Sequence, residues 1–182
     1  MIGIIIVVII VLLLIYIVST YNNLVNLRNK VKDQWAQIEV LLKRRYDLIP
    51  NLVETVKGYA KHEKETLDAV ISARNSAVSA KTTEEEMKAA GEVSNALGRL
   101  IAISESYPEL KANENFMDLQ NNLKETEDKI SFSRQFYNDV VLTYKNKIEM
   151  FPSNLVASIF GFKEEPFFEA NEEERKNVQV KF

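Results

Sequence analysis

Hydrophobic positions follow two patterns along this chain: an unbroken apolar run at the N-terminus, and spaced apolar positions from about residue 21 onward. Residues 2–18 are apolar apart from Gly3 and the phenol of Tyr16. Since a helix rises about 1.5 Å per residue, this run would be about 25 Å long, at the short end of the range that spans a bilayer. We therefore expect residues 1–20 to form a transmembrane anchor that contacts the lipid bilayer through residues 2–18.

A secretory signal peptide, removed from the mature protein, is the alternative interpretation of this run. No Lys or Arg precedes the run, and residues 18–20 (VST) are a weak cleavage sequence, so the pattern favours a retained single-pass anchor. Basic residues follow the run and none precedes it, which by the positive-inside rule places the N-terminus outside and the following domain in the cytoplasm. The basic residues are Arg28, Lys30 and Lys32.

Beyond the anchor, apolar residues recur in steps of three and four, the spacing of amphipathic helices. Only 5 Gly and 4 Pro occur in 182 residues, which favours few and long helices. The pattern predicts helices over about 21–48, 50–80, 84–105 and 113–151, with Pro50 and Pro108 at breaks. Thr83 and Glu86 fit a capping box at the start of the third helix. The fold class is thus all-α: a membrane helix followed by an antiparallel four-helix bundle, long and coiled-coil-like, over residues 21–151.

Each predicted helix has an apolar stripe that we expect to form the core. The last stripe keeps a heptad spacing throughout, except that Glu127 and Arg134 interrupt it. The stripes are Leu24, Val31, Trp35, Ile38, Leu42, Tyr46 and Ile49; Leu52, Val56, Tyr59, Leu67, Val70 and Ala77; Met87, Ala90, Val93, Leu97 and Ile101; and Phe116, Leu119, Leu123, Ile130, Tyr137, Val141, Tyr144, Ile148 and Phe151.

Residues 152–182 depart from the helical pattern, and we expect a tail that is partly folded back on the bundle and then disordered from the acidic run at 172–174. Four aromatic residues in this tail have two interpretations. They either cover the end of the bundle, or form an exposed patch that docks a partner or dips into the membrane. They are Phe160, Phe162, Phe167 and Phe168.

Five charged residues fall on or near the apolar stripes. An unpaired buried charge costs several kcal/mol, so we expect these side chains to pair across helices or to reach solvent. Ion pairs that fix the helix register are the favoured interpretation, and a polar ligand site inside the bundle is the alternative. The residues are Arg45, Glu63, Arg74, Glu127 and Arg134.

The residue types present offer little for catalysis. The chain has no Cys and a single His, His62, which lacks the Glu-x-x-His pairing of di-metal bundles, so we expect no metal site and no cofactor. No phosphate-binding Gly-rich loop or Gly-x-Ser-x-Gly motif occurs, so we expect no enzyme. A net charge of −3 makes nucleic acid a poor candidate partner.

Several segments resemble the LemA family across almost the whole chain. They are residues 21–31 (YNNLVNLRNKV), 34–40 (QWAQIEV), 43–53 (KRRYDLIPNLV), 59–63 (YAKHE), 107–113 (YPELKAN) and 116–127. The resemblance implies a short N-terminal tail, one membrane helix and an antiparallel helical domain. It carries over no catalytic residues, because none is established for the family.

Two functions remain open from the sequence. The first is a membrane-anchored scaffold or assembly protein of the bacterial cell envelope, which self-associates or binds another envelope protein. The second is an envelope-stress sensor or small-ligand-binding helical bundle, which requires a polar cavity around the five charged residues.

Overall fold

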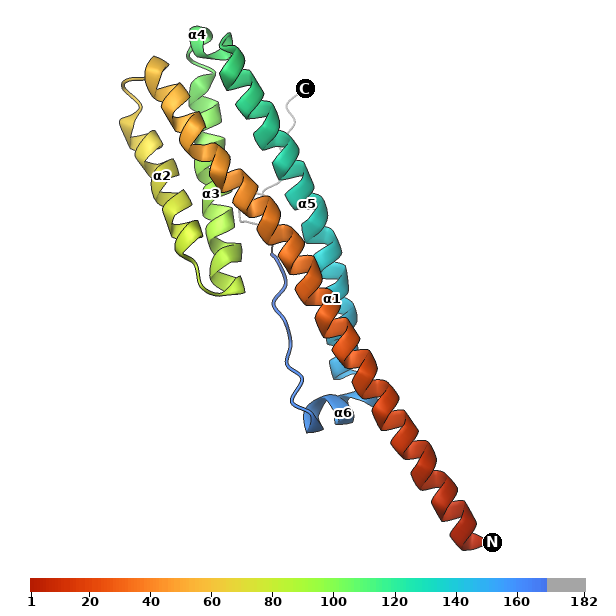
Figure 1. The fold of residues 1–182 in the computed structure, drawn as a ribbon. Helices are drawn as coiled ribbons and strands as arrows, with labels where there is room; N and C mark the ends of the chain where they lie inside the picture. Colours follow the sequence, from red (N-terminus) through yellow and green to blue (C-terminus); the bar gives the residue numbers. More distant parts are fainter. Residues whose placement is uncertain (170–182) are drawn as a thin grey trace, which may run out of the picture. The chain divides into compact units, whose positions relative to one another are not determined.

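The computed structural model describes residues 1–169, and this part of the chain is all-helical (Figure 1). The acidic run at 172–174, for which the sequence predicted disorder, lies outside the described residues. The helices are α1 (Ile2–Tyr59), α2 (Lys64–Ser79), α3 (Thr83–Ser104), α4 (Pro108–Lys111), α5 (Glu114–Glu149) and α6 (Ser153–Ile159).

The chain divides into two compact units, and each is described by itself. The first unit contains residues 1–37 and 134–167, and the second contains residues 38–133 with 168 and 169. Both α1 and α5 contribute to each unit. The N-terminal part of α1 and the C-terminal part of α5 belong to the first unit, and the remaining parts of both helices belong to the second.

The prediction that helix ends at about residue 48 is wrong, because α1 continues through Pro50 to Tyr59. A proline inside a helix lacks the N–H that would bond the carbonyl four residues earlier, here that of Tyr46. In the structure Arg74 of α2 donates to this carbonyl from Nε at 3.0 Å. Pro50 itself is exposed, so its ring adds no bulk to the core. The break instead falls at residues 60–63, before α2.

In the first unit, α1 and α5 pack with opposite directions. The ring of Trp35 meets that of Tyr137 edge-on, with centroids 5.6 Å apart. Arg28 lies one heptad before Trp35 on α1, and Tyr144 lies one heptad after Tyr137 on α5. The charge of Arg28 acts on the Tyr144 phenol. Burial raises the pKa of that phenol, and the Arg28 charge opposes the rise.

In the second unit, α2 and α3 form a helical hairpin. Thr82 is the N-cap of α3, since its Oγ1 accepts from the N–H of Glu85 at 3.2 Å. The capping box predicted for Thr83 and Glu86 is therefore one residue out of register. Two threonines followed by three glutamates satisfy the motif in either register, so the sequence pattern alone did not decide between them.

The predicted stripes form most of the core. All seven stripe residues from Leu24 to Ile49 are buried, as are most stripe residues of the other helices. Two large stripe residues are exposed: Tyr59 at 40% and Phe151 at 79%. Phe151 follows the end of α5 at Glu149, so the heptad no longer sets its direction.

The N-terminal segment of α1 carries the apolar run. Its most apolar window has a mean hydropathy of 3.4 and none of it is buried inside the protein. Among the described residues, α1 is the one helix long and apolar enough to cross a membrane. A signal sequence passes the same criterion, which rests on length and composition.

Candidate functional site

The side chain of Arg45 is the most polar group in the core of the second unit. It projects from α1, and only 1% of the residue is exposed. Its Nη1 donates to Glu127 Oε2 of α5 at 2.8 Å and to Ser94 Oγ of α3 at 2.9 Å, and its Nη2 donates to the Ala90 carbonyl of α3 at 3.0 Å. One buried guanidinium thus holds three helices together.

The partners of Arg45 compensate its burial in part, because its two Nη atoms are bonded while its Nε has no hydrogen-bond partner among the described residues. Glu127 is close enough for a salt bridge, and because its side chain is 41% exposed it keeps contact with solvent. Ser94 Oγ also lies 3.2 Å from the second oxygen of Glu127, which completes a three-residue network. Such a charge-assisted network fixes helix register, whereas loss of one partner leaves a buried charge.

Arg45 also stacks on its neighbour in the chain. Its guanidinium carbon lies 5.4 Å from the centre of the Tyr46 ring, a cation–π distance. Burial raises the pKa of the Tyr46 phenol, and the Arg45 charge opposes that rise. The phenol is therefore neutral across the physiological range.

A groove of about 410 Å³ opens beside this network, between α3 and α5. Its lining is mainly apolar, with the Glu127 carboxylate and the Ser94 hydroxyl at one end. A groove of this composition is suited to an apolar group rather than to a highly charged ligand. The lining residues are Ser94, Leu97, Gly98, Ile101, Gln120, Leu123, Lys124, Glu127 and Asp128.

The charged residues singled out in the sequence have different partners in the second unit. Arg45 and Glu127 form the ion pair. Glu63 instead accepts from the Tyr107 hydroxyl at 3.0 Å, and Arg74 donates to the Tyr46 carbonyl. Arg134 belongs to the first unit, whereas the other four belong to the second. The polar contacts are thus distributed along the helices.

Arg74 lines a second cleft of about 460 Å³, between α1, α2 and α3. This cleft holds two carboxylates, because Glu39 and Glu86 both line it. Burial, followed by the charge of Glu39, raises the pKa of Glu86. The other lining residues are Leu42, Lys43, Tyr46, Asp47, Ala77, Val78 and Ala80.

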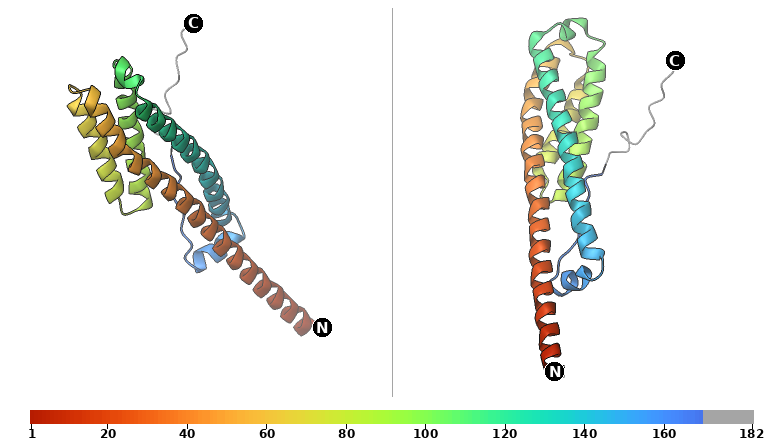
Figure 2. Two further views of the ribbon diagram at one scale, coloured as in Figure 1. Left: turned by 45° about the horizontal axis from the view of Figure 1, so that its top comes forward. Right: turned by 90° about the vertical axis from the view of Figure 1, so that its right-hand side faces the viewer.

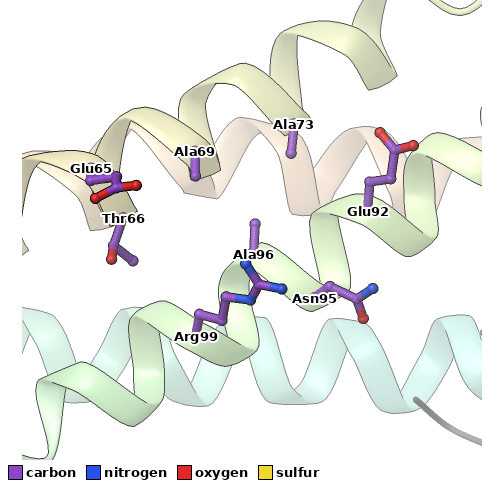
Figure 3. A pocket seen from close by; sticks show the side chains of 8 residues that line it. All are labelled: Glu65, Thr66, Ala69, Ala73, Glu92, Asn95, Ala96 and Arg99. Carbon is purple, nitrogen blue, oxygen red and sulfur yellow. The ribbon is translucent and has the colours of Figure 1, made fainter. Parts of the chain in front are cut away.

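A third cleft of about 400 Å³ separates α2 from α3 and is seen from close by in Figure 3. Ala69 and Ala73 of α2 face Ala96 of α3 across it, while Glu92 and Arg99 extend from α3. Three alanines leave this space open, and the polar residues Glu65, Thr66 and Asn95 line it as well. Within residues 1–169 there is no group of three or more His, Asp or Glu side chains that could hold a metal ion. His62 is exposed between α1 and α2.

The aromatic residues of the tail separate into different environments. Phe160 and Phe162 both contact Tyr21 of α1, with ring centroids 4.8 and 5.7 Å away. The Arg28 guanidinium carbon lies 5.2 Å from the centre of the Phe162 ring. Phe168 is buried, and Phe167 is half-buried. The four residues therefore do not form one exposed patch.

Sequence reasoning missed two parts of this arrangement. It did not include Ser94 or the Ala90 carbonyl among the partners of Arg45, and no motif marks a single serine as a buried acceptor. It also named only Phe160 as a contact residue among the exposed apolar residues at α6 and missed Met150, Phe151, Leu155 and Ile159. A usable signal existed there, because the chain carries no charged residue from Met150 to Phe162 although 27% of all residues are charged.

Known proteins similar to this chain include magnetosome proteins. Magnetosome protein MamQ 2 of Paramagnetospirillum magneticum is 29% identical over 175 residues, covering 82% of this chain and 64% of that protein. Magnetosome protein MamQ of Magnetospirillum gryphiswaldense is 28% identical over 174 residues, with 81% and 64% covered. The chain thus spans less than two thirds of the length of these relatives.

A relative of more similar length is Protein LemA of Metamycoplasma hominis, which is 27% identical over 166 residues, covering 90% of this chain and 75% of that protein. The family model described as LemA family matches residues 34–182, which contain α2 to α6, the Arg45 network and most of the helical part of α1 that follows the apolar run. With this match over most of its length, the membrane-associated helical chain described above belongs to the LemA family.

Proposed function

We propose that this protein is a single-pass, membrane-anchored scaffold of the bacterial cell envelope that acts by contact and not by catalysis. The observation that carries the proposal is the continuity of α1, which runs from the exposed apolar segment into the helical domain without an intervening loop. The helix that leaves the apolar segment is already packed in the first unit at Leu24 and Val31, so the folded chain is attached directly to the membrane, as a membrane-anchored scaffold requires.

Packing immediately after the apolar run supports a retained anchor. Thr20 is 6% exposed and Leu24 is fully buried, so the folded part begins directly after Val18. The basic residues that follow the run further support an outside N-terminus and a cytoplasmic domain.

The polar contacts of the second unit support a rigid helical domain. We propose that the parts of α1, α2, α3 and α5 in this unit act as an antiparallel four-helix bundle whose register Arg45 fixes. Its contacts would then be with a second copy of the chain or with another envelope protein. The MamQ relatives are named as magnetosome proteins, which is compatible with a role at a membrane.

The alternative function is a small-ligand-binding bundle that senses envelope stress. The mainly apolar groove beside Glu127 is the observation in its favour. Arg74 bonds a main-chain carbonyl and Glu63 accepts from the Tyr107 hydroxyl, and these separate partners weigh against the shared polar cavity that this function would need.

Anchor and topology are tested together in intact cells. The chain has no Cys, so single-cysteine variants can be labelled with a membrane-impermeant maleimide without background. We expect a cysteine in a short Gly-Ser extension added at the N-terminus to be labelled from outside and S76C, on the exposed side of α2, only after lysis. Labelling of S76C in intact cells would overturn the orientation, and a mature mass lacking the first residues would overturn the anchor.

Assembly is tested by cross-linking full-length protein in native membranes, followed by mass spectrometry. A photo-reactive residue at Val78, an exposed apolar position on α2, serves as the probe, and one at Lys61 serves as a polar exposed control. We expect a discrete adduct, with itself or with one envelope protein, from Val78. A protein that yields only monomer at both positions would contradict the scaffold proposal.

A further inference from the structure

The short helix α6 has two unlike faces. Ser153, Val156 and Ala157, spaced as one side of a helix, are buried against the protein. On the other side Leu155 is 55% exposed and Ile159 is 76% exposed. A large apolar surface left in water is unfavourable by about 25 cal/mol per Å² and usually marks a contact site.

The exposed apolar side of α6 continues into its flanking residues. Met150 and Phe151 precede the helix and Phe160 follows it, and all three are more than half exposed. No charged residue occurs from Met150 to Phe162. We call the exposed side chains the α6 apolar face: Met150, Phe151, Leu155, Ile159 and Phe160.

The position of this face is fixed by Tyr21. The Phe160 ring lies 4.8 Å from that of Tyr21, and Phe162 contacts the same tyrosine. Both Figure 1 and the right-hand view of Figure 2 draw α6 beside α1 within the first unit. The α6 apolar face therefore lies at the level of α1 where the apolar run has just ended.

The distance along α1 identifies the environment at that level. From Val18, the last residue of the apolar run, to Tyr21 the helix rises about 4.5 Å. The headgroup layer on each side of a bilayer is about 5–8 Å thick. With residues 2–18 in the hydrocarbon core, Tyr21 and the rings against it lie in the headgroup layer, where amphipathic aromatic side chains are favoured.

We propose that α6 is an interfacial helix that inserts its apolar face into the bilayer that α1 spans. This inference rests on the proposed anchor and adds a second membrane contact to it. Interfacial helices bury an apolar face about 5–10 Å into the boundary of headgroups and acyl chains. A typical one needs a charged face toward water, but α6 needs none, because its other face is covered by the protein itself.

A second membrane contact has a mechanical consequence. One helix crossing a bilayer leaves the first unit free to rotate and tilt, whereas an additional contact beside it fixes the orientation of this unit against the surface. The segment after α6 is itself held to α5, because Lys145 forms an ion pair with Glu164 at 2.8 Å and Tyr137 donates to the Pro166 carbonyl at 2.8 Å. Insertion of α6 would therefore orient α5 as well.

The test places an environment-sensitive nitrobenzoxadiazole probe on single cysteines of the full-length protein in nanodiscs of phosphatidylethanolamine and phosphatidylglycerol. The reporter is I159C, the aqueous control is S76C on the exposed side of α2, which should give water-like and unquenched emission, and the anchor control is I10C in the middle of the apolar run. Lipids that carry a spin label near the headgroup or near the chain end report the depth of each probe.

We expect blue-shifted emission from I159C, with stronger quenching by the headgroup-proximal label, and stronger quenching of I10C by the chain-end label. The variant L155E/I159E, read with the probe at F151C, should lose the blue shift. Since both substituted side chains are exposed, its helical circular dichroism and Tm in detergent should match those of the F151C parent.

Each failure has a separate meaning. If the probe at I10C is quenched while the probe at I159C shows water-like, unquenched emission, the inference is overturned and the proposed anchor stands. Water-like emission at both positions would overturn the proposed anchor and the inference with it. The inference would also be overturned if the blue shift at I159C were the same in nanodiscs and in lipid-free detergent, and if spin-labelled lipid did not quench the probe.

Discussion

The Nε atom of Arg74 donates a hydrogen bond of 3.0 Å to the main-chain carbonyl oxygen of Tyr46. That carbonyl stands four residues before Pro50, so it is the acceptor that Pro50, having no N–H, leaves without its helical partner. A side chain of α2 thus supplies the bond that α1 lacks. The contact lets α1 pass a proline and ties it to α2 at that point.

Removal of this donor should destabilise the protein in a way that depends on the proline. R74M keeps the apolar stem of the side chain and removes the donor. We expect a loss of about 1–3 kcal/mol in the free energy of unfolding, the cost of an unsatisfied carbonyl. In a P50A background, where residue 50 regains its N–H, R74M should cost less, because the helix then satisfies Tyr46 itself. Denaturant unfolding in detergent measures all four variants.

A matched control is R99M, which removes an exposed arginine from α3. Exposed substitutions of this kind usually change stability by less than about 0.5 kcal/mol. Equal costs of R74M with proline or alanine at position 50 would show that the contact does not compensate for the proline.

Helix positions and core residues followed from the spacing of apolar residues, because steps of three and four leave one side for the core. The continuation of α1 through Pro50 did not follow from it, since it depends on an arginine that lies 28 residues after Tyr46 in the chain. Local rules describe the intrinsic cost of a proline in a helix, and they contain no information on a donor from another helix.

The Arg45–Glu127 pair should show strong energetic coupling. R45M and E127L each leave one partner of the ion pair without the other, so each should lower stability by about 2–4 kcal/mol. The upper end is expected for E127L, which leaves the buried Arg45 charge without a carboxylate, whereas R45M leaves a Glu127 side chain that is 41% exposed. The double variant should be closer to the wild type than the two single costs predict, since it removes both charges. A double-mutant cycle measures the coupling, and strict additivity would contradict the pair.

The candidate site was only partly predictable for a physical reason. Charged residues on an apolar stripe must find partners, and this argument identified Arg45 and Glu127 among five candidates. It could not assign partners, because the choice among carboxylates, carbonyls and hydroxyls depends on helix rotation and offset. Arg74 pairs with a carbonyl and Glu63 with the hydroxyl of Tyr107, neither of which a charge pattern indicates.

Glu86 should lower the stability of the protein at neutral pH. Burial and then the charge of Glu39 raise its pKa, so the folded chain holds this proton more tightly than the unfolded chain does. Stability is accordingly greater when Glu86 is protonated, and it falls as the pH rises through the folded-state pKa. E86Q should therefore raise Tm at pH 7, and the gain should disappear below about pH 4, where the glutamate is protonated in both states.

The control for this titration is E84Q, in the first turn of the same helix. A carboxylate there interacts favourably with the helix dipole, so its removal should leave Tm unchanged or slightly lower at pH 7. A gain from E86Q that persists undiminished at low pH would exclude charge burial as its cause.

The hydrogen bond from Tyr137 to the Pro166 carbonyl should hold the segment after α6 against α5. Y137F removes the hydroxyl, which donates at 2.8 Å, and keeps the ring that meets Trp35 edge-on. We expect a loss of about 1 kcal/mol, together with faster limited trypsin cleavage after the exposed Lys163. Fluorescence of Trp35, the one tryptophan of the chain, should stay unchanged because its ring contact is retained.

Y107F, which removes the hydroxyl that Glu63 accepts from, is the matched control and should leave cleavage after Lys163 unaltered. Equal cleavage rates in Y137F and the wild type would mean that the Lys145–Glu164 ion pair, and not the tyrosine, holds this segment in place.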